Sequence, residues 1–130
     1  MTDGLLSGCR ILIVEDDYYQ AHDSQELLEQ AGARIVSVGA VVPDIIALLG
    51  EGQIDAALID INLGQSLSFD FARVLRDHAI PFVFLTGYDA SIVPGDLVGA
   101  PCISKPAEAK RIVEELSRIA FPQRITGDPG

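Results

Sequence analysis

Three consecutive acidic residues end the first apolar run of this chain. In the segment "ILIVEDD", Glu15, Asp16 and Asp17 follow directly after the apolar residues 11–14. Carboxylates about 5 Å apart repel by roughly 3 kcal/mol at an effective dielectric constant near 20, so a cluster of them needs protons or a cation. Mg²⁺ suits such a cluster because it takes one or two carboxylates and completes its shell with water and phosphoryl oxygens. Asp17 has a second interpretation, since aspartate is also a favoured helix cap.

Three further reactive side chains also end or follow apolar runs. Asp60 ends "AALID", Thr86 ends "FVFLT" and Lys105 follows "CIS". Each alone has an ordinary structural explanation, since aspartate is common in turns, threonine is favoured in strands and lysine is usually a solvated charge. If the ends of these runs meet, the site combines a carboxylate nucleophile, a hydroxyl donor and a cation beside the acidic cluster.

The pattern of apolar runs predicts how these residues are positioned. Five short runs rich in β-branched residues are typical of strands, and segments with helical spacing lie between them. Such alternation implies a doubly wound α/β fold, with parallel strands, right-handed crossovers and helices on both faces. In the flavodoxin-like strand order 2-1-3-4-5, the carboxyl ends of the first and third strands flank the ligand-binding point, where Glu15, Asp16 and Asp60 are expected to meet. The expected strands are residues 10–14, 34–38, 56–59, 81–85 and 102–104.

The helices are predicted from their start and stop residues. The first ends at Gly32, the second begins at Pro43, and the third has its N-cap at Ser66 or Ser68. The segment "SIVPGDLVGAP" is rich in proline and glycine and predicts a short or irregular fourth helix. The last helix has one apolar face, formed by Ala109, Ile112, Val113, Leu116 and Ala120.

Composition limits the classes of function. A chain of 130 residues with 48% hydrophobic residues suits one globular domain with a single core. Its formal charge of −10 argues against binding to nucleic acids, which requires a basic surface. No apolar run reaches the roughly 18 residues of a membrane span, and residues 1–8 lack the features of a signal peptide. With Cys9 and Cys102 interpreted as packed thiols, we expect a cytoplasmic protein without membrane contacts.

Four motifs in register give the chain a family resemblance. The segments "ILIVEDD", "ALIDINL", "FLTG" and "SKP" occur in an order and at spacings that resemble the receiver domain of two-component response regulators. Each motif is weak alone, but the four together on an alternating βα pattern are highly specific. The resemblance extends from residue 9 to about residue 120 and implies the CheY-like variant of the flavodoxin-like fold.

The resemblance assigns a role to each candidate residue. Asp60 matches the residue that accepts the phosphoryl group, and Thr86 and Lys105 match the hydroxyl and the cation that contact this group. A cis peptide bond is expected before Pro106. The implied cofactor is Mg²⁺, with Mn²⁺ as an alternative. The ligands that the resemblance implies for this metal are Glu15, Asp16, Asp60 and the backbone carbonyl of Asn62.

Departures from the usual receiver pattern bear on how a signal leaves the site. Gly64 stands where many receivers have proline, and Cys102 stands where an aromatic residue commonly precedes the lysine by three positions. The stretch "PFVFLTGY" resembles a set of stand-alone receivers with a PFxFxTGY signature, which places Tyr88 close after the threonine. In that set the fourth helix is poorly formed. We therefore expect residues 87–99, rather than an aromatic switch, to respond to phosphorylation.

Together these features predict one receiver domain over residues 1–120 and a short tail, residues 121–130, without an output domain. The expected function is to accept a phosphoryl group from a histidine kinase or a histidine phosphotransfer protein, as a monomer and not as an enzyme. Its signal would pass by protein–protein interaction or phosphoryl shuttling. Two alternatives stay open: a pseudo-receiver that is not phosphorylated, and an aspartate-based phosphatase. The phosphatase is disfavoured because its nucleophile usually lies in a D-x-D pattern after the first strand.

Overall fold

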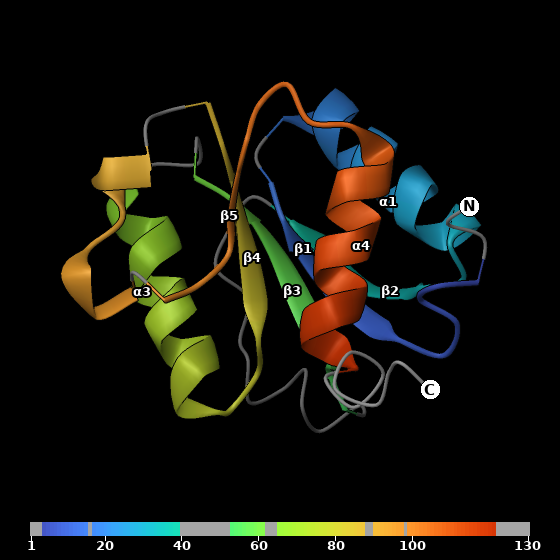
Figure 1. Cartoon of the computed structure of the whole chain (residues 1–130), viewed down its shortest axis with the longest axis horizontal. Helices are drawn as coiled ribbons and strands as arrows, with labels where there is room; N and C mark the ends of the chain where they lie inside the picture. Colours follow the sequence, from blue (N-terminus) through green and yellow to red (C-terminus); the bar gives the residue numbers. More distant parts are fainter. Residues whose placement is uncertain are drawn as a thin grey trace, which may run out of the picture.

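The protein is built around a five-stranded sheet in which every pair of neighbouring strands is parallel (Figure 1). The computed structural model describes residues 4–15, 17–39, 53–61, 65–87, 90–97 and 99–121. The strand order is β2-β1-β3-β4-β5, which confirms the predicted topology. The strands are β1 (Arg10–Val14), β2 (Arg34–Gly39), β3 (Ala56–Asp60), β4 (Phe82–Thr86) and β5 (Cys102–Ser104).

Helices cover both faces of this sheet, as the βα alternation predicts. Helices α1 and α4 lie on one face and α3 lies on the other (Figure 1). The helix expected after Pro43 falls outside the described residues. None of the helices in the described ranges is long and apolar enough to span a membrane. The helices are α1 (Tyr18–Gln30), α3 (Gln65–Asp77) and α4 (Ala109–Ala120), with 3₁₀ turns η1 (Ala90–Ile92) and η2 (Gly95–Leu97) between β4 and β5.

Each central strand sends alternate side chains into two separate cores. On β1, Leu12 and Val14 pack into the core beneath α3, whereas Ile11 and Ile13 pack into the core beneath α1 and α4. On β4, Phe84 is fully buried on the α3 side. Because both faces are covered, the strands are apolar along their whole length and only their ends can display polar groups. This is why the reactive side chains lie at strand ends.

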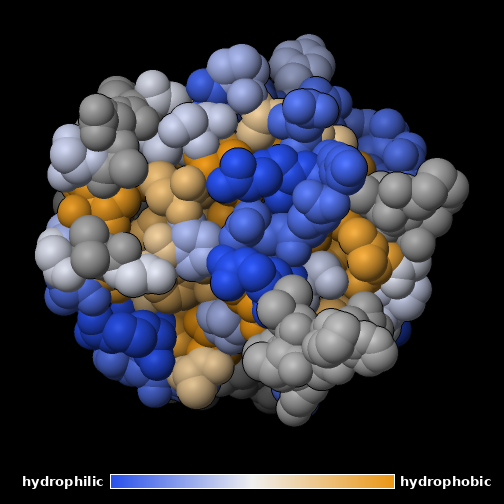
Figure 2. Space-filling model, viewed as in Figure 1, coloured by the Kyte–Doolittle hydropathy of each residue, from blue (hydrophilic) through white to orange (hydrophobic). Residues whose placement is uncertain are grey.

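The sequence pattern of α4 is reproduced on its surface. Figure 2 shows hydrophilic residues along its solvent-facing side, where Lys110, Glu114 and Arg118 are exposed. The opposite side buries Ile112 and Leu116 against the sheet. The helix is therefore amphipathic in the predicted sense.

Two predicted details of the helices are wrong. Helix α3 begins earlier than expected, at Gln65, so Ser66 and Ser68 lie in its first turn and not at its N-cap. The N–H groups of a first turn have no intrahelical acceptor, so serine is tolerated there as well. Ala109 is exposed although it was expected on the apolar face of α4, because it opens the helix one turn before the buried residues begin at Ile112.

The connection between β4 and β5 is irregular, which confirms the expectation for the fourth helix. In its described residues it contains only the two 3₁₀ turns, yet Val93 and Leu97 are 8% and 3% exposed and belong to the core beneath α3. Asp96 forms ion pairs with Arg73 and Arg76 of α3, at 2.9 and 3.1 Å. These pairs lower the pKa of Asp96 to about 2, chiefly through the hydrogen bond from Arg73. Core burial and a charged tether thus hold a segment of poor helix propensity.

Candidate functional site

The parallel topology gathers four of the predicted site residues at the carboxyl ends of the central strands. Asp60 is the last residue of β3 and Thr86 is the last residue of β4. Glu15 directly follows β1, and Lys105 directly follows β5. Asp60, Glu15 and Thr86 are 2%, 5% and 0% exposed, although charged and polar residues are seldom so buried without a partner.

The partner of Asp60 is Lys105. The Lys105 ammonium donates a hydrogen bond to Asp60 Oδ2 at 2.5 Å, and the lysine side chain is 19% exposed. The backbone N–H of Lys105 donates to the carbonyl oxygen of Thr86 at 2.7 Å, which fixes the start of the following loop. The peptide bond between Lys105 and Pro106 is cis, as the family resemblance implies. Asp60 is therefore a buried carboxylate that contacts a cation at the carboxyl ends of the strands.

Glu15 is the second carboxylate at this point. Burial raises the pKa of Glu15 to about 8, and a hydrogen bond with Asp60 adds to the increase. The backbone N–H of Asp17, which donates to Glu15 Oε2 at 3.1 Å, opposes it. At neutral pH the Glu15 carboxyl therefore carries a proton, beside the Asp60 carboxylate. Without a cation, the proton on Glu15 removes the predicted repulsion between the two carboxylates.

Asp17 has a different role from Glu15. Its Oδ1 accepts hydrogen bonds from the backbone N–H groups of Tyr19 and Gln20, at 2.9 and 3.1 Å. It is thus the N-cap of α1, as its second interpretation predicts. The acidic cluster therefore divides into an inward-facing residue, Glu15, and a capping residue, Asp17.

The donor set fits a divalent cation. Asp16 and Asn62 lie outside the described residues, and within those ranges no group of three His, Cys, Asp or Glu side chains forms a metal site. The two carboxylates that are described, Glu15 and Asp60, are hydrogen-bonded to each other, and the raised pKa of Glu15 keeps a proton on that residue. Hard oxygen ligands at this spacing are those that Mg²⁺ takes, and the cation would displace that proton.

One contact at the site was not predicted from the sequence. Gln20, in the first turn of α1, accepts a hydrogen bond from the Lys105 ammonium through its side-chain oxygen, at 2.8 Å. A glutamine in the first turn of a helix belongs to no recognised motif, and its partner, Lys105, lies 85 residues away in the sequence. Its position three residues after Asp17, the last residue of the acidic cluster, was the sole signal that it faces the same site.

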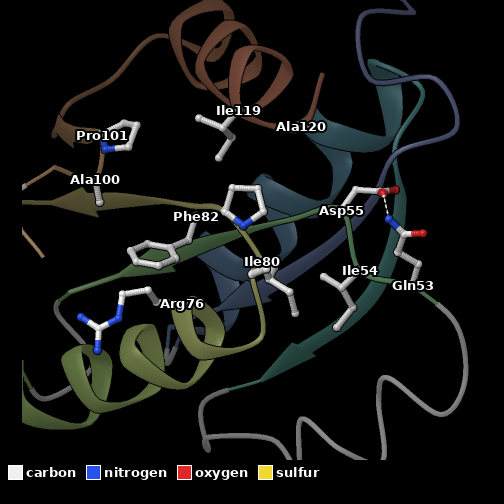
Figure 3. Close-up of a pocket in the computed structure, with 12 residues that line it drawn as sticks. Gln53, Ile54, Asp55, Arg76, Ile80, Phe82, Ala100, Pro101, Ile119 and Ala120 are labelled. Carbon is white, nitrogen blue, oxygen red and sulfur yellow. Dashed lines mark hydrogen bonds between the residues drawn. The ribbon is translucent and has the colours of Figure 1, made fainter. Parts of the chain in front are cut away.

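The pocket drawn in Figure 3 does not belong to this site. It has a volume of about 620 Å³, and its lining includes Phe82 at the start of β4 and Pro101 just before β5. It therefore lies at the amino ends of the strands, opposite to Asp60. Its walls are mainly apolar, with Ile54, Ile80 and Pro101 among the labelled residues in Figure 3.

The shifted pKa of Glu15 predicts how stability depends on pH. The folded protein holds this proton up to about pH 8, whereas the unfolded chain loses it near 4.5. Between these values the folded state binds more protons, so the free energy of unfolding decreases as pH rises. We expect the metal-free protein to melt at a lower temperature at pH 8 than at pH 6, measured by circular dichroism with EDTA present. Glu15→Gln should flatten this slope, and an equal slope in both proteins would contradict the assignment.

Comparison with known proteins agrees with this geometry. The sequence matches the family described as response regulator receiver domain over residues 11–117. This chain therefore belongs to the receiver domains of two-component response regulators, a family that is typically signalling rather than catalytic and typically binds Mg²⁺. Membership implies a histidine kinase as a partner.

Individual relatives are distant. The sensory transduction protein LytT of Bacillus anthracis is 28% identical over an alignment of 130 positions, which covers 91% of this chain and 53% of that protein. The sensor protein TorS of Escherichia coli (strain K12) is 31% identical over 88 residues, which is 68% of this chain and 10% of TorS. The chain thus spans about half the length of LytT and a small part of TorS.

Solved structures show the same fold. The receiver domain of the TMAO respiratory system response regulator TorR superposes with a TM-score of 0.72 at 25% identity, covering 88% of this chain and 98% of that one. A CheY-like receiver domain protein from Methanospirillum hungatei JF-1 gives a TM-score of 0.72 at 22% identity, covering 92% and 98% of the two chains.

Proposed function

We propose that this domain accepts a phosphoryl group on Asp60 from a phosphohistidine of a histidine kinase or a histidine phosphotransfer protein. The observation that carries the proposal is the buried Asp60 carboxylate, which ends a central strand and faces both Lys105 and Glu15. Burying a carboxylate costs free energy unless it is paired, and buried acids beside a specific charged partner are found preferentially at functional sites.

The proposed transfer needs little beyond positioning and charge. A carboxylate oxygen of Asp60 attacks the phosphorus, and the bond from phosphorus to the histidine nitrogen breaks with its electron pair going to the imidazole. Lys105 stays beside the group and pairs with a phosphoryl oxygen, while the Thr86 hydroxyl at the end of β4 donates to another. The product is an acyl phosphate, which water hydrolyses to inorganic phosphate and free Asp60. The signal is therefore transient.

The metal site forms part of the same proposal. Glu15, Asp16, Asp60 and the backbone carbonyl of Asn62 would hold Mg²⁺, and Mn²⁺ is an alternative with the same ligand preferences. When bound, the ion supplies positive charge to the phosphoryl oxygens. Glu15 then no longer needs its proton, so its carboxylate is ionised in the reactive state.

The mode of signalling follows from the same proposal. We infer a cytoplasmic, monomeric receiver domain over residues 1–120, with residues 121–130 following it as a tail. Its output would be a protein–protein contact or the passage of the phosphoryl group to another carrier. The PFxFxTGY signature favours the stand-alone type.

Phosphorylation is tested most directly with a small phosphoryl donor. Incubation with acetyl phosphate and Mg²⁺ should add one phosphoryl group to the wild-type protein, measured by intact mass spectrometry. Asp60→Asn and Asp60→Ala should take up none, because Asp60 is the carboxylate that forms an ion pair with Lys105 in the described ranges. Asp77→Asn, on the exposed end of α3, is a matched control and should be labelled normally. Labelling that persists in both Asp60 variants would overturn the proposal, and an unlabelled wild type would favour the pseudo-receiver.

A second prediction concerns the segment expected to carry the signal. Asp96 tethers residues 90–97 to Arg73 and Arg76, and exposed ion pairs of this kind make a small contribution to stability. Asp96→Asn should therefore speed amide exchange of residues 90–97 about fivefold in the unphosphorylated protein, measured by hydrogen–deuterium exchange. Asp70→Asn is the control, because Asp70 pairs with Arg73 within α3 and does not hold the segment. Equal exchange in both variants would show that core burial alone holds it.

A further inference from the structure

The ammonium group of Lys105 has two acceptors that come from different parts of the chain. It donates to Asp60 Oδ2 at the end of β3 and to Gln20 Oε1 in the first turn of α1, at 2.5 and 2.8 Å. An ammonium carries three N–H donors, so these two bonds fix its direction and leave a third donor for another ligand. A flexible four-carbon side chain needs such fixing to stay at one place.

Gln20 is itself held in place by the helix cap. Asp17 accepts a hydrogen bond from the backbone N–H of Gln20 at 3.1 Å, and the backbone N–H of Asp17 donates to Glu15. Glu15 in turn bonds to Asp60, which bonds to Lys105. The contacts therefore form a closed ring in which α1 and the strand ends position one another. Gln20 is the member of the ring that reaches the lysine from the helix side.

Because the Gln20 acceptor is an amide, Lys105 keeps its positive charge. A glutamine amide is neutral, so it directs the ammonium without cancelling its charge, whereas a carboxylate in the same place would neutralise it. Gln20 and Lys105 both line a pocket of about 470 Å³ between α1 and the start of α4, together with Pro106 and Leu27. This pocket gives the lysine side chain somewhere else to go if the amide is removed.

We propose that Gln20 is a positioning residue, which holds the Lys105 ammonium beside Asp60 while leaving its charge available to a phosphoryl group. Its effect on phosphorylation rests on the function proposed for Asp60, but its effect on the lysine does not. Gln20 acts through Lys105 and does not itself react.

The lysine composition of the chain allows a direct test of position. Lys105 and Lys110 are its two lysines, and their side chains are 19% and 63% exposed. Brief acetylation with an N-hydroxysuccinimide ester, followed by cleavage after Glu108 and peptide mass spectrometry, reports each lysine separately. The ratio of Lys105 to Lys110 labelling is then an internal measure of how firmly Lys105 is held, without metal or phosphoryl donor.

Two substitutions of Gln20 test separately the presence of a hydrogen-bond acceptor and the effect of a negative charge on that acceptor. Gln20→Met keeps the length but removes the acceptor, and should raise the labelling ratio about fivefold, as expected for loss of one hydrogen bond to a charged group near solvent. Gln20→Glu restores an acceptor and should return the ratio to the wild-type value. The matched control is Gln25→Met, because Gln25 is also on α1 and bonds to Glu29, away from the lysine. Because Gln20 is exposed and Gln25 is only half-buried, all three variants should fold like the wild type.

Phosphorylation by acetyl phosphate gives the second measurement. Gln20→Met should lower the maximum rate about fivefold with little change in the concentration of acetyl phosphate that gives half that rate, since the lysine is misplaced and the donor is still bound. Gln20→Glu should also lower the maximum rate, although its lysine is held, because the added carboxylate competes for the ammonium charge. Gln25→Glu makes the same change of net charge on α1 and should leave the rate unchanged.

The outcomes distinguish this inference from the proposed function. An unchanged labelling ratio in Gln20→Met, or an equal rise in Gln25→Met, would overturn the positioning role whatever the phosphorylation assay shows. A raised ratio in Gln20→Met with no phosphorylation of the wild type would support the positioning contact and overturn the function proposed for Asp60. A raised ratio together with an unchanged phosphorylation rate would overturn the claim that this position matters for the reaction.

Discussion

Replacement of Lys105 by methionine should slow phosphorylation of Asp60 by acetyl phosphate about a hundredfold or more, which is the effect of removing one preorganised donor from a developing negative charge. The reason lies in the geometry of the site. Lys105 supplies the cation that contacts the buried Asp60 carboxylate, and its side chain is itself largely buried. Methionine preserves the packing of the stem but leaves the phosphoryl oxygens without this charge. The measurement is the rate at which the phosphorylated mass appears at saturating Mg²⁺.

Lys110 provides the matched control for this prediction. Lys110→Met removes the same charge from the same short stretch of chain, but the Lys110 side chain is 63% exposed and pairs only loosely with Glu114, at 4.0 Å. Its phosphorylation rate should equal that of the wild type. Lys105→Arg keeps the charge but not the compact ammonium, so its rate should fall between those of the wild type and Lys105→Met. A wild-type rate in Lys105→Met would remove the lysine from the proposed chemistry.

The affinity for Mg²⁺ should increase about fiftyfold between pH 6 and pH 8. Without metal, burial and the hydrogen bond with Asp60 raise the pKa of Glu15 to about 8, so the carboxyl is protonated at pH 6 and half ionised near pH 8. A cation can bind to this oxygen only after the proton leaves, and the ionised fraction rises about fiftyfold over this interval. Isothermal titration calorimetry at both pH values measures the effect, together with the release of protons on binding.

Glu15→Gln is the control for this pH dependence. Glutamine cannot titrate, so the variant should bind Mg²⁺ more weakly than the wild type at pH 8 but with little change between pH 6 and pH 8. Asp17→Asn should retain the pH dependence of the wild type, because Asp17 caps α1 and does not face Asp60. A wild-type affinity that is flat over this range would show that Glu15 is not a ligand of the metal.

The sequence alone was sufficient to predict the architecture and the location of the site. Alternating apolar runs and helical segments permit few topologies, and in a parallel sheet all strands point the same way, so residues that end different strands must share one edge. For this reason Asp60, Thr86 and Lys105 could be placed together from local patterns. The capping role of Asp17 was also available from the sequence, because capping depends on neighbours within three residues.

Details at the ends of the helices were less predictable. The start of α3 at Gln65 and the exposure of Ala109 were both missed, since helix boundaries depend on how the first turn meets the sheet and not on the periodic pattern within the helix. The irregular connection between β4 and β5 was foreseen from its prolines and glycines. That it is held by Asp96 against Arg73 and Arg76 was not, because these partners are more than one element apart in the chain.

The protonation of the site and its long-range hydrogen bonds were decided by tertiary structure alone. The sequence shows that Glu15 and Asp60 are acids, but only their burial side by side raises the pKa of Glu15 to about 8. Likewise, nothing in the first turn of α1 indicates that Gln20 receives the ammonium of a lysine 85 residues later. Such contacts depend on distances between segments that are brought together by packing, and both desolvation and hydrogen bonding change steeply with those distances.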